Sequence, residues 1–340
     1  MAKPKDIAGI DCEAAAAEAI RFVLITRFEE MCALRDHALD WSDPEGVHDM
    51  RVSSRRLRGA LRDFMPYLHK RRLSVALDQL RDLADALGAV RDQDVAIIGL
   101  QKLAAGAPDE AAAMLNQLVR ARETIRNQAR KDLRQSLQKG HLKQLQSDFV
   151  TAVDSITGNS KPLKRRSKSA QDGAEANYQE VARGIIKERL KEVEKLSDGL
   201  YRPLKMKPLH RMRIAAKRLR YALELFEPCW GPSISSFAKK VAALQTSLGE
   251  LHDSDIWIET FGEHLNGIEK QSKDRSAAEL WLLSHFVKLH SKHLRKSLEN
   301  WRDWEASEVG SRLRDCLQQD SLVTVQAVGP HPPKRKKAEN

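Results

Sequence analysis

Positively charged side chains recur along one short stretch of this sequence at the spacing of a single helix face. In VHDMRVSSRRLRGALRDF, which covers 47–64, a helical rotation of about 100° per residue gathers five side chains on one side: His48, Arg51, Arg55, Arg58 and Arg62. Arginine guanidinium groups bind phosphate oxygens in bidentate geometry. Because like charges at i,i+3 and i,i+4 repel each other, a bound anion explains this face better than solubility does.

The same pattern occurs a second time. LHRMRIAAKRLRYALELFEP at 209–228 matches VHDMRVSSRRLRGALRDFMP at 47–66 with an offset of 162 and ten identities in twenty positions. The second basic face, which ends at Glu224, comprises His210, Arg213, Lys217 and Arg220. In both copies apolar residues lie on the side opposite the charges. In the first copy these apolar residues are Met50, Leu57, Ala60, Leu61 and Phe64. The pattern predicts two amphipathic helices that bind one phosphate-rich polyanion. Each histidine is predicted to open its helix, where free backbone N–H groups also favour an anion.

The repeat continues beyond these helices. LGAVRDQDV at 87–95 matches LGELHDSDI at 248–256, and KDLRQSL at 131–137 matches KHLRKSL at 292–298. We expect four helical stretches in each copy, at 11–40, 47–64, 70–90 and 93–149 and at 175–199, 209–226, 234–251 and 254–303, with interruptions at 106–108 and Gly267. The copies would span 11–157 and 175–320, joined by a flexible basic linker at 158–174 and followed by a disordered basic tail at 321–340.

Two further arginines, Arg56 and Arg218, lie about 100° from the basic faces and are expected to pair with carboxylates of neighbouring helices. Four aspartates that follow Leu-Gly are expected to cap the next helices and to hold such arginines: Asp92, Asp94, Asp253 and Asp255. Whether Lys131, Arg134, Lys292 and Arg295 extend the basic surface is left open.

Composition narrows the class of protein. With 340 residues, the chain has room for two units, and its net charge of +11 indicates a polyanionic partner. The sequence has no run of 18 apolar residues and no signal-peptide pattern, so a cytoplasmic protein is expected. The four cysteines lack CxxC spacing and are expected to be reduced thiols: Cys12, Cys32, Cys229 and Cys316.

Parts of the sequence are also typical of two other functions. Two His-Asp dipeptides, His48-Asp49 and His252-Asp253, are typical of metal-dependent phosphohydrolases, which are the more remote alternative. Neither dipeptide recurs in the other copy, where Arg211 stands opposite Asp49 and Arg91 opposite His252, and the many arginines nearby oppose a cation. Nucleic acid also binds to rows of basic side chains. Its bases stack on aromatic side chains, however, and these are only 5% of the chain, with Tyr221 the one aromatic near both faces. We therefore expect no catalytic residue, metal or cofactor, with RNA or DNA as the alternative ligand.

The stretches HDMRVSSRRLRGALRDF and HRMRIAAKRLRYALELF, each followed by LGxxxDxD[VI], resemble the CHAD domain, the conserved histidine α-helical domain, over 11–320. The resemblance implies an all-α fold of two four-helix bundles, related by a pseudo-two-fold axis, with the basic helices facing a central cavity. It also implies binding of inorganic polyphosphate, often at polyphosphate granules, by the nine residues of the two basic faces. The chain has no ExExK motif at its start, so the activity of a fused triphosphate tunnel domain is not expected.

Overall fold

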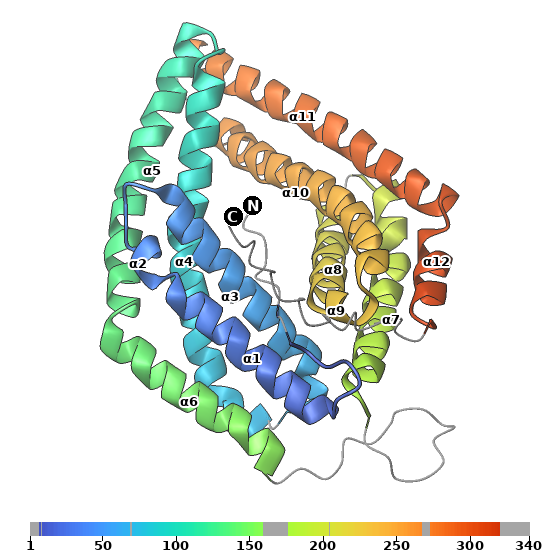
Figure 1. The fold of residues 1–340 in the computed structure, drawn as a ribbon. Helices are drawn as coiled ribbons and strands as arrows, with labels where there is room; N and C mark the ends of the chain where they lie inside the picture. Colours follow the sequence, from blue (N-terminus) through green and yellow to red (C-terminus); the bar gives the residue numbers. More distant parts are fainter. Residues whose placement is uncertain are drawn as a thin grey trace, which may run out of the picture.

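The computed structural model describes residues 7, 9–68, 70–158, 176–203, 205–266 and 273–319, and every regular element within them is helical (Figure 1). The first half contains α1 (Ala16–Ala33), α2 (Arg35–Ala38), α3 (Pro44–Phe64), η1 (Met65–Tyr67), α4 (Lys70–Ala104), α5 (Asp109–Ser136) and α6 (Lys139–Gly158). The second half contains α7 (Tyr178–Leu196), η2 (Ser197–Tyr201), α8 (Met206–Leu225), α9 (Glu227–Trp230), α10 (Pro232–Asn266), α11 (Lys273–Ala306) and α12 (Val309–Cys316). The all-α prediction is confirmed.

Side-chain caps mark the beginning of α3, which carries the first basic face, and of α7, which packs against α8. Asp43 caps α3 by accepting a hydrogen bond from the backbone N–H of Glu45 at 2.9 Å, and Pro44 occupies the first helical position. Asn177 caps α7 in the same way, with the N–H of Glu180 as donor. All five apolar residues predicted opposite the α3 charges are buried. The amphipathic character predicted for α3 is therefore confirmed.

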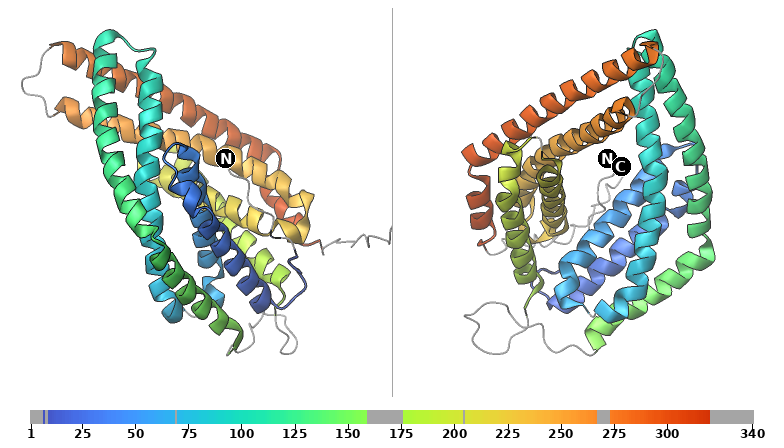
Figure 2. Two further views of the ribbon diagram at one scale, coloured as in Figure 1. Left: turned by 60° about the vertical axis from the view of Figure 1, so that its left-hand side comes forward. Right: turned by 180° about the vertical axis from the view of Figure 1, so that it is seen from behind.

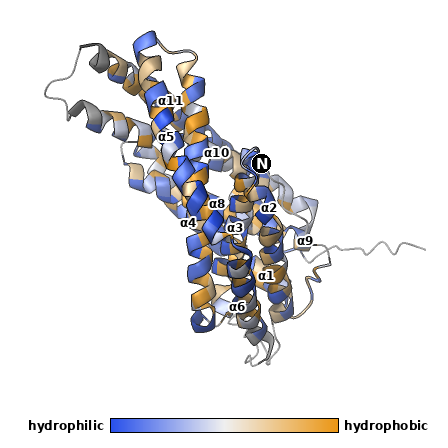
Figure 3. Cartoon of the chain, turned by 90° about the vertical axis from the view of Figure 1, so that its left-hand side faces the viewer, coloured by the Kyte–Doolittle hydropathy of each residue, from blue (hydrophilic) through white to orange (hydrophobic). Residues whose placement is uncertain are grey.

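Two long helical hairpins, α4–α5 and α10–α11, dominate the molecule and converge at one end of it (Figures 1 and 2). At that end seven buried apolar residues form a cluster of their own: Ile97, Leu100, Leu115, Val119, Phe261, Leu282 and Phe286. Residues of α4 and α5 therefore share an apolar core with residues of α10 and α11. Along the helices, hydrophobic and hydrophilic residues alternate around the axis (Figure 3).

A larger core joins the two halves elsewhere, where α1 contacts α7 and α3 contacts α8. Phe64, Tyr178 and Phe226 pack there with ring centroids 5.5–6.2 Å apart, and none of the three is exposed to solvent. Aromatic side chains bury a large apolar area, so this contact fixes the ends of α3 and α8 against the start of α7.

Several predicted helix boundaries are wrong. Helix α4 runs without interruption through 91–92 and α10 through 252–253, because Leu-Gly lies inside each helix and does not end it. The break at 106–108 is confirmed, whereas a second break between α5 and α6 was not predicted. The predicted tail, and the predicted linker beyond Gly158, lie outside the described residues, as does Gly267. The pseudo-two-fold relation stays a prediction.

The prediction of four reduced thiols is wrong for one pair, since Cys12 and Cys229 form a disulfide with their Cα atoms 5.6 Å apart. Their separation of 217 residues gave no local spacing signal, and only the fold brings the segment before α1 against α9. Cys32 and Cys316 are free thiols. None of the helices within the described ranges is long and apolar enough to cross a membrane.

Candidate anion-binding site

The basic faces of α3 and α8 meet at a pocket between the two halves. This α3–α8 pocket has an empty volume of about 840 Å³ and is open to solvent. Its lining residues are Arg55, Arg58, Gly59, Arg62, Ile214, Lys217, Arg218 and Tyr221. Five of these eight residues are cationic and none is a carboxylate, so the pocket suits an anion.

The structure thus brings four of the nine predicted residues together in one pocket: Arg55, Arg58, Arg62 and Lys217. The other five, His48, Arg51, His210, Arg213 and Arg220, lie on the same helices but do not line it. The sequence analysis did not place Arg218 in the binding site. One signal could have pointed to it, since the repeat-related position 56 is also an arginine. Gly59 and Tyr221 occupy equivalent positions in the repeat and face each other, since a Cβ on Gly59 would lie 3.7 Å from the Tyr221 ring.

The pKa of Lys217 reflects the high density of positive charge around it. Burial, together with the nearby guanidinium groups of Arg55, Arg213, Arg51 and Arg62, lowers the pKa of Lys217 from 10.5 to about 8. Two of these arginines come from outside the pocket lining, so the positive field extends beyond the pocket. An anion bound at this position would relieve repulsion that the free protein has to sustain.

Carboxylates neutralise one end of this field. Arg51 Nη1 donates to Asp92 Oδ1 at 2.6 Å, which links α3 to α4. In the second half Asp253 lies near Arg213, and burial together with the neighbouring Asp92 raises the pKa of Asp253. Asp92 and Asp253 therefore lie close to each other and to the first arginine of each basic face.

The expected capping role of the four aspartates is wrong, because all of them lie inside α4 or α10. They were expected to hold Arg56 and Arg218, but Asp92 pairs with Arg51, Asp94 lies 3.6 and 3.8 Å from Arg126 and Arg130, and Arg218 pairs with Glu192. Asp255 instead pairs with His290 at 3.2 Å.

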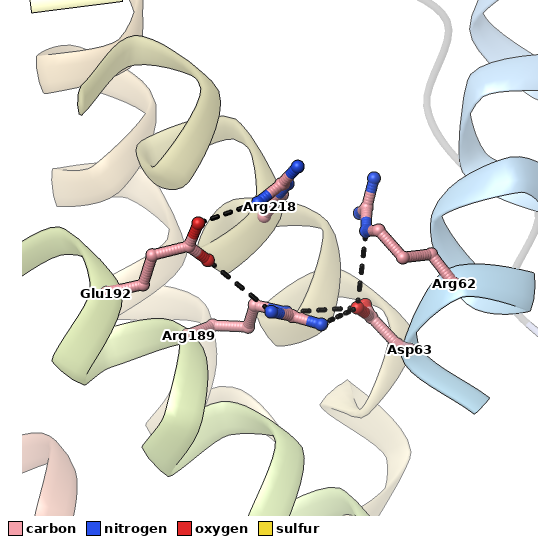
Figure 4. A network of polar contacts seen from close by, with 5 residues as sticks. All are labelled: Arg62, Asp63, Arg189, Glu192 and Arg218. Atoms are coloured by element: carbon pink, nitrogen blue, oxygen red, sulfur yellow. Dashed lines mark hydrogen bonds and ion pairs between the residues drawn. The ribbon is translucent and has the colours of Figure 1, made fainter. Parts of the chain in front are cut away.

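A network of ion pairs lies at the other end of the basic faces (Figure 4). Arg218 donates to Glu192 at 2.6 Å, as expected for an arginine off the main face, and Arg189 bridges Glu192 to Asp63. Figure 4 shows Arg62 beside Asp63 in the same network. In the second copy, Arg220 pairs with Glu224 at 2.6 Å. At this end the last cation of the second basic face, Arg220, is therefore paired more closely with a carboxylate than Arg62 of the first face, which lies 3.7 Å from Asp63.

The histidines do not open their helices, because α3 and α8 begin four residues before His48 and His210. Burial lowers the pKa of both side chains, helped by Arg91 at His48 and by Arg213 at His210. The His210 ring packs against that of His252, with centroids 4.6 Å apart, and burial together with Arg213 and His210 lowers the pKa of His252 to about 4. Both predicted histidines are therefore neutral at pH 7 in the free protein.

One group of side chains has the spacing of metal ligands within the described part of the chain. Ligand atoms of Glu45, His48 and Asp49 lie within 4.8 Å of one another. Arg91 Nη1 is 3.5 Å from Glu45, and its positive charge disfavours a cation there. Lys131, Arg134, Lys292 and Arg295 are exposed, and none of them lines the α3–α8 pocket.

The fold and this pocket define an all-helical protein with a pocket of cationic lining between its two halves. The sequence profile of the CHAD domain matches residues 23–262, more than half of the chain, and the protein belongs to the CHAD domain family. Two uncharacterized proteins from strains of Mycobacterium tuberculosis, Rv2226 and MT2285, are 26% identical to it over 232 residues. That alignment covers 67% of this chain, which spans only 42% of the length of these relatives.

Two solved structures share the fold. The CHAD domain from the plant Ricinus communis superimposes with a TM-score of 0.62 at 23% identity, over 86% of this chain and 96% of that one. PptA from Streptomyces chartreusis superimposes with a TM-score of 0.59 at 14% identity, over 85% of this chain and all of the other. At these identities the likeness concerns the fold alone.

Proposed function

We propose that this protein binds inorganic polyphosphate in the α3–α8 pocket and catalyses no reaction on it. The observation that carries the proposal is the lining itself, with five cationic side chains from both halves and no carboxylate. A polyphosphate chain presents oxygens along its whole length, so arginines spaced along two helices can each bind a different phosphate group.

The shortage of aromatic residues favours polyphosphate over nucleic acid. Tyr221 is the one aromatic side chain among the residues that line the pocket. Proteins that bind single strands without sequence preference stack successive bases on several aromatic rings. A chain of phosphates has no bases, so it needs none of them. Membership of the CHAD domain family supports the same ligand, and polyphosphate granules are the cellular location that we propose.

Competition tests the choice of ligand. Fluorescent polyphosphate is bound to the protein at near-physiological salt and displaced by unlabelled polyphosphate, single-stranded RNA or duplex DNA at equal phosphate concentration. We expect displacement by polyphosphate alone, with an affinity that falls steeply as salt rises, because binding a linear polyanion releases counterions. Equal displacement by all three would favour the nucleic-acid alternative, and metal-dependent shortening of the chain would reveal an enzyme.

Charge reversal tests the site. Arg58→Glu combined with Lys217→Glu, one lining residue from each half, should abolish polyphosphate binding while circular dichroism shows unchanged helicity. A matched control makes the same change of net charge at two exposed residues, Arg71→Glu on α4 with Lys239→Glu on α10. If the control lost as much affinity as the first pair, net charge and not this site would explain binding.

A further inference from the structure

A second pocket lies where the segment before α3 meets α4 and α5. It has an empty volume of about 620 Å³ and shares no residue with the α3–α8 pocket. Its lining residues are Trp41, Pro44, Asp94, Ile97, Ile98, Gln101, Glu123, Arg126 and Arg130. The basic-face pattern does not include these residues, so the proposed polyphosphate site leaves this pocket without a role.

Three polar atoms of this pocket are buried without a hydrogen-bond partner among the described residues. They are Asp94 Oδ2, Arg126 Nε and Arg130 Nε. The Asp94 side chain is only 3% exposed, and its contacts of 3.6 and 3.8 Å to the two arginines are longer than hydrogen bonds. An occupant that offers a donor beside an acceptor would satisfy these atoms, whereas an empty pocket leaves them unpaired.

The walls favour a flat, partly apolar occupant. Trp41, Pro44, Ile97 and Ile98 supply the apolar part of the lining. The guanidinium group of Arg130 lies over the Trp41 ring, 5.1 Å from its centroid, and that of Arg134 lies 5.8 Å away. Stacked arginine and tryptophan side chains are a common surface for nucleobases.

Positive charge continues from the pocket along α5. Arginines recur there at every fourth residue, at Arg122, Arg126, Arg130 and Arg134. Arg122 donates to the neutral side chain of Gln93 at 3.3 Å, and Asp94 faces Arg126 and Arg130. Glu123 is a second carboxylate in the lining, so four arginines stand against two carboxylates here. Like charges at i,i+4 repel each other, so this row favours a phosphate group at the mouth of the pocket.

We propose that this pocket binds a nucleotide whose base carries an amino group. The amino group donates to Asp94 Oδ2, the adjacent ring nitrogen accepts from an arginine Nε, and the ring lies along Trp41 and Ile97. The phosphate group contacts the arginine row outside. This inference goes beyond polyphosphate binding and does not depend on it.

Calorimetric titration with adenosine monophosphate and inosine monophosphate tests the proposal on the whole chain. Inosine monophosphate exchanges donor and acceptor, because its O6 accepts and its N1–H donates. In the same position it would point an acceptor at Asp94 Oδ2 and a donor at the arginine Nε, so we expect it to bind at least tenfold more weakly. Saturating polyphosphate should leave binding of adenosine monophosphate unchanged. Equal binding of the two nucleotides, or displacement of adenosine monophosphate by inorganic phosphate, would overturn the proposal.

Two variants locate the site with little risk to folding. Ile98→Asp places a negative charge in the lining at a side chain that is 53% exposed, and should weaken binding at least tenfold. Ile125→Asp is the matched control, because Ile125 is 50% exposed on α5 but does not line the pocket. Equal affinities of the two variants would overturn the assignment. Tighter binding of an adenylate oligonucleotide than of the free nucleotide would identify RNA as the source of the base.

Discussion

Asp63 at the end of α3 accepts hydrogen bonds from both Nε and Nη2 of Arg189 on α7, at 3.0 and 2.8 Å, across 126 residues of sequence. The Asp63 side chain is 1% exposed, so this ion pair is a buried contact between the two halves. Asp63 also lies 3.7 Å from the Nε of Arg62, which lines the α3–α8 pocket. The contact therefore connects the stability of the interface with the position of a proposed binding residue.

Asp63→Asn should destabilise the protein by about 3 kcal/mol, because the substitution leaves Arg189 buried with less of its charge compensated. Chemical denaturation followed by circular dichroism measures the change. The second copy has Leu225 at the position of Asp63. We therefore expect Asp63→Leu combined with Arg189→Met to recover most of the lost stability, and a double variant as unstable as Asp63→Asn would contradict this account.

Polyphosphate affinity should fall as the pH rises through 8. Lys217 has a pKa lowered to about 8, so it loses its proton above that pH in the free protein. A bound polyanion favours the charged form, and binding above pH 8 must therefore take up a proton, which weakens it by at most tenfold per pH unit. Fluorescence anisotropy between pH 7 and 9.5 measures the slope.

Lys217→Arg is the control for this pH dependence, because arginine keeps its charge over the whole range. The variant should bind as well as the wild type at pH 7 and show a shallower loss above pH 8. An identical pH profile in the two proteins would mean that another group titrates.

Removing the carboxylates beside the first arginines should strengthen binding. In the proposed complex polyphosphate would compete with Asp92 for Arg51, and Asp253 lies near Arg213 in the other half. We expect Asp92→Asn combined with Asp253→Asn to raise affinity several-fold, mostly by removing repulsion of the ligand. Asp78→Asn on α4 is the control, since Asp78 forms an exposed ion pair with Arg81, and it should have a much smaller effect.

Reduction should destabilise the protein. The disulfide between Cys12 and Cys229 closes a long loop and ties the segment before α1 to α9. Cys12→Ser should lower the free energy of unfolding by about 2–4 kcal/mol, and dithiothreitol should lower the Tm of the wild type but not that of the variant. If dithiothreitol lowered the Tm of the wild type and of the variant by the same amount, the disulfide would not contribute to stability.

The sequence by itself determined the features that depend on neighbours along one helix. The rotation of 3.6 residues per turn places Arg51, Arg55, Arg58 and Arg62 on one face, and the apolar side chains opposite them had to be buried. The repeat and the charge pattern likewise predicted an all-α protein and most of its helical segments. Helix ends were predicted poorly where Leu-Gly lies inside a long helix, because tertiary packing there overrides the weak helix propensity of glycine.

Only the tertiary structure decided which distant side chains meet. Lys217 has its pKa lowered by arginines of α3 as well as α8, and Arg218 reaches both the pocket and Glu192. The pairing of Cys12 with Cys229 and the convergence of Trp41, Asp94 and Arg130 left no pattern along the chain. Each of these contacts depends on the angles and distances at which separate helices pack, and those are set by the whole core and not by any local sequence.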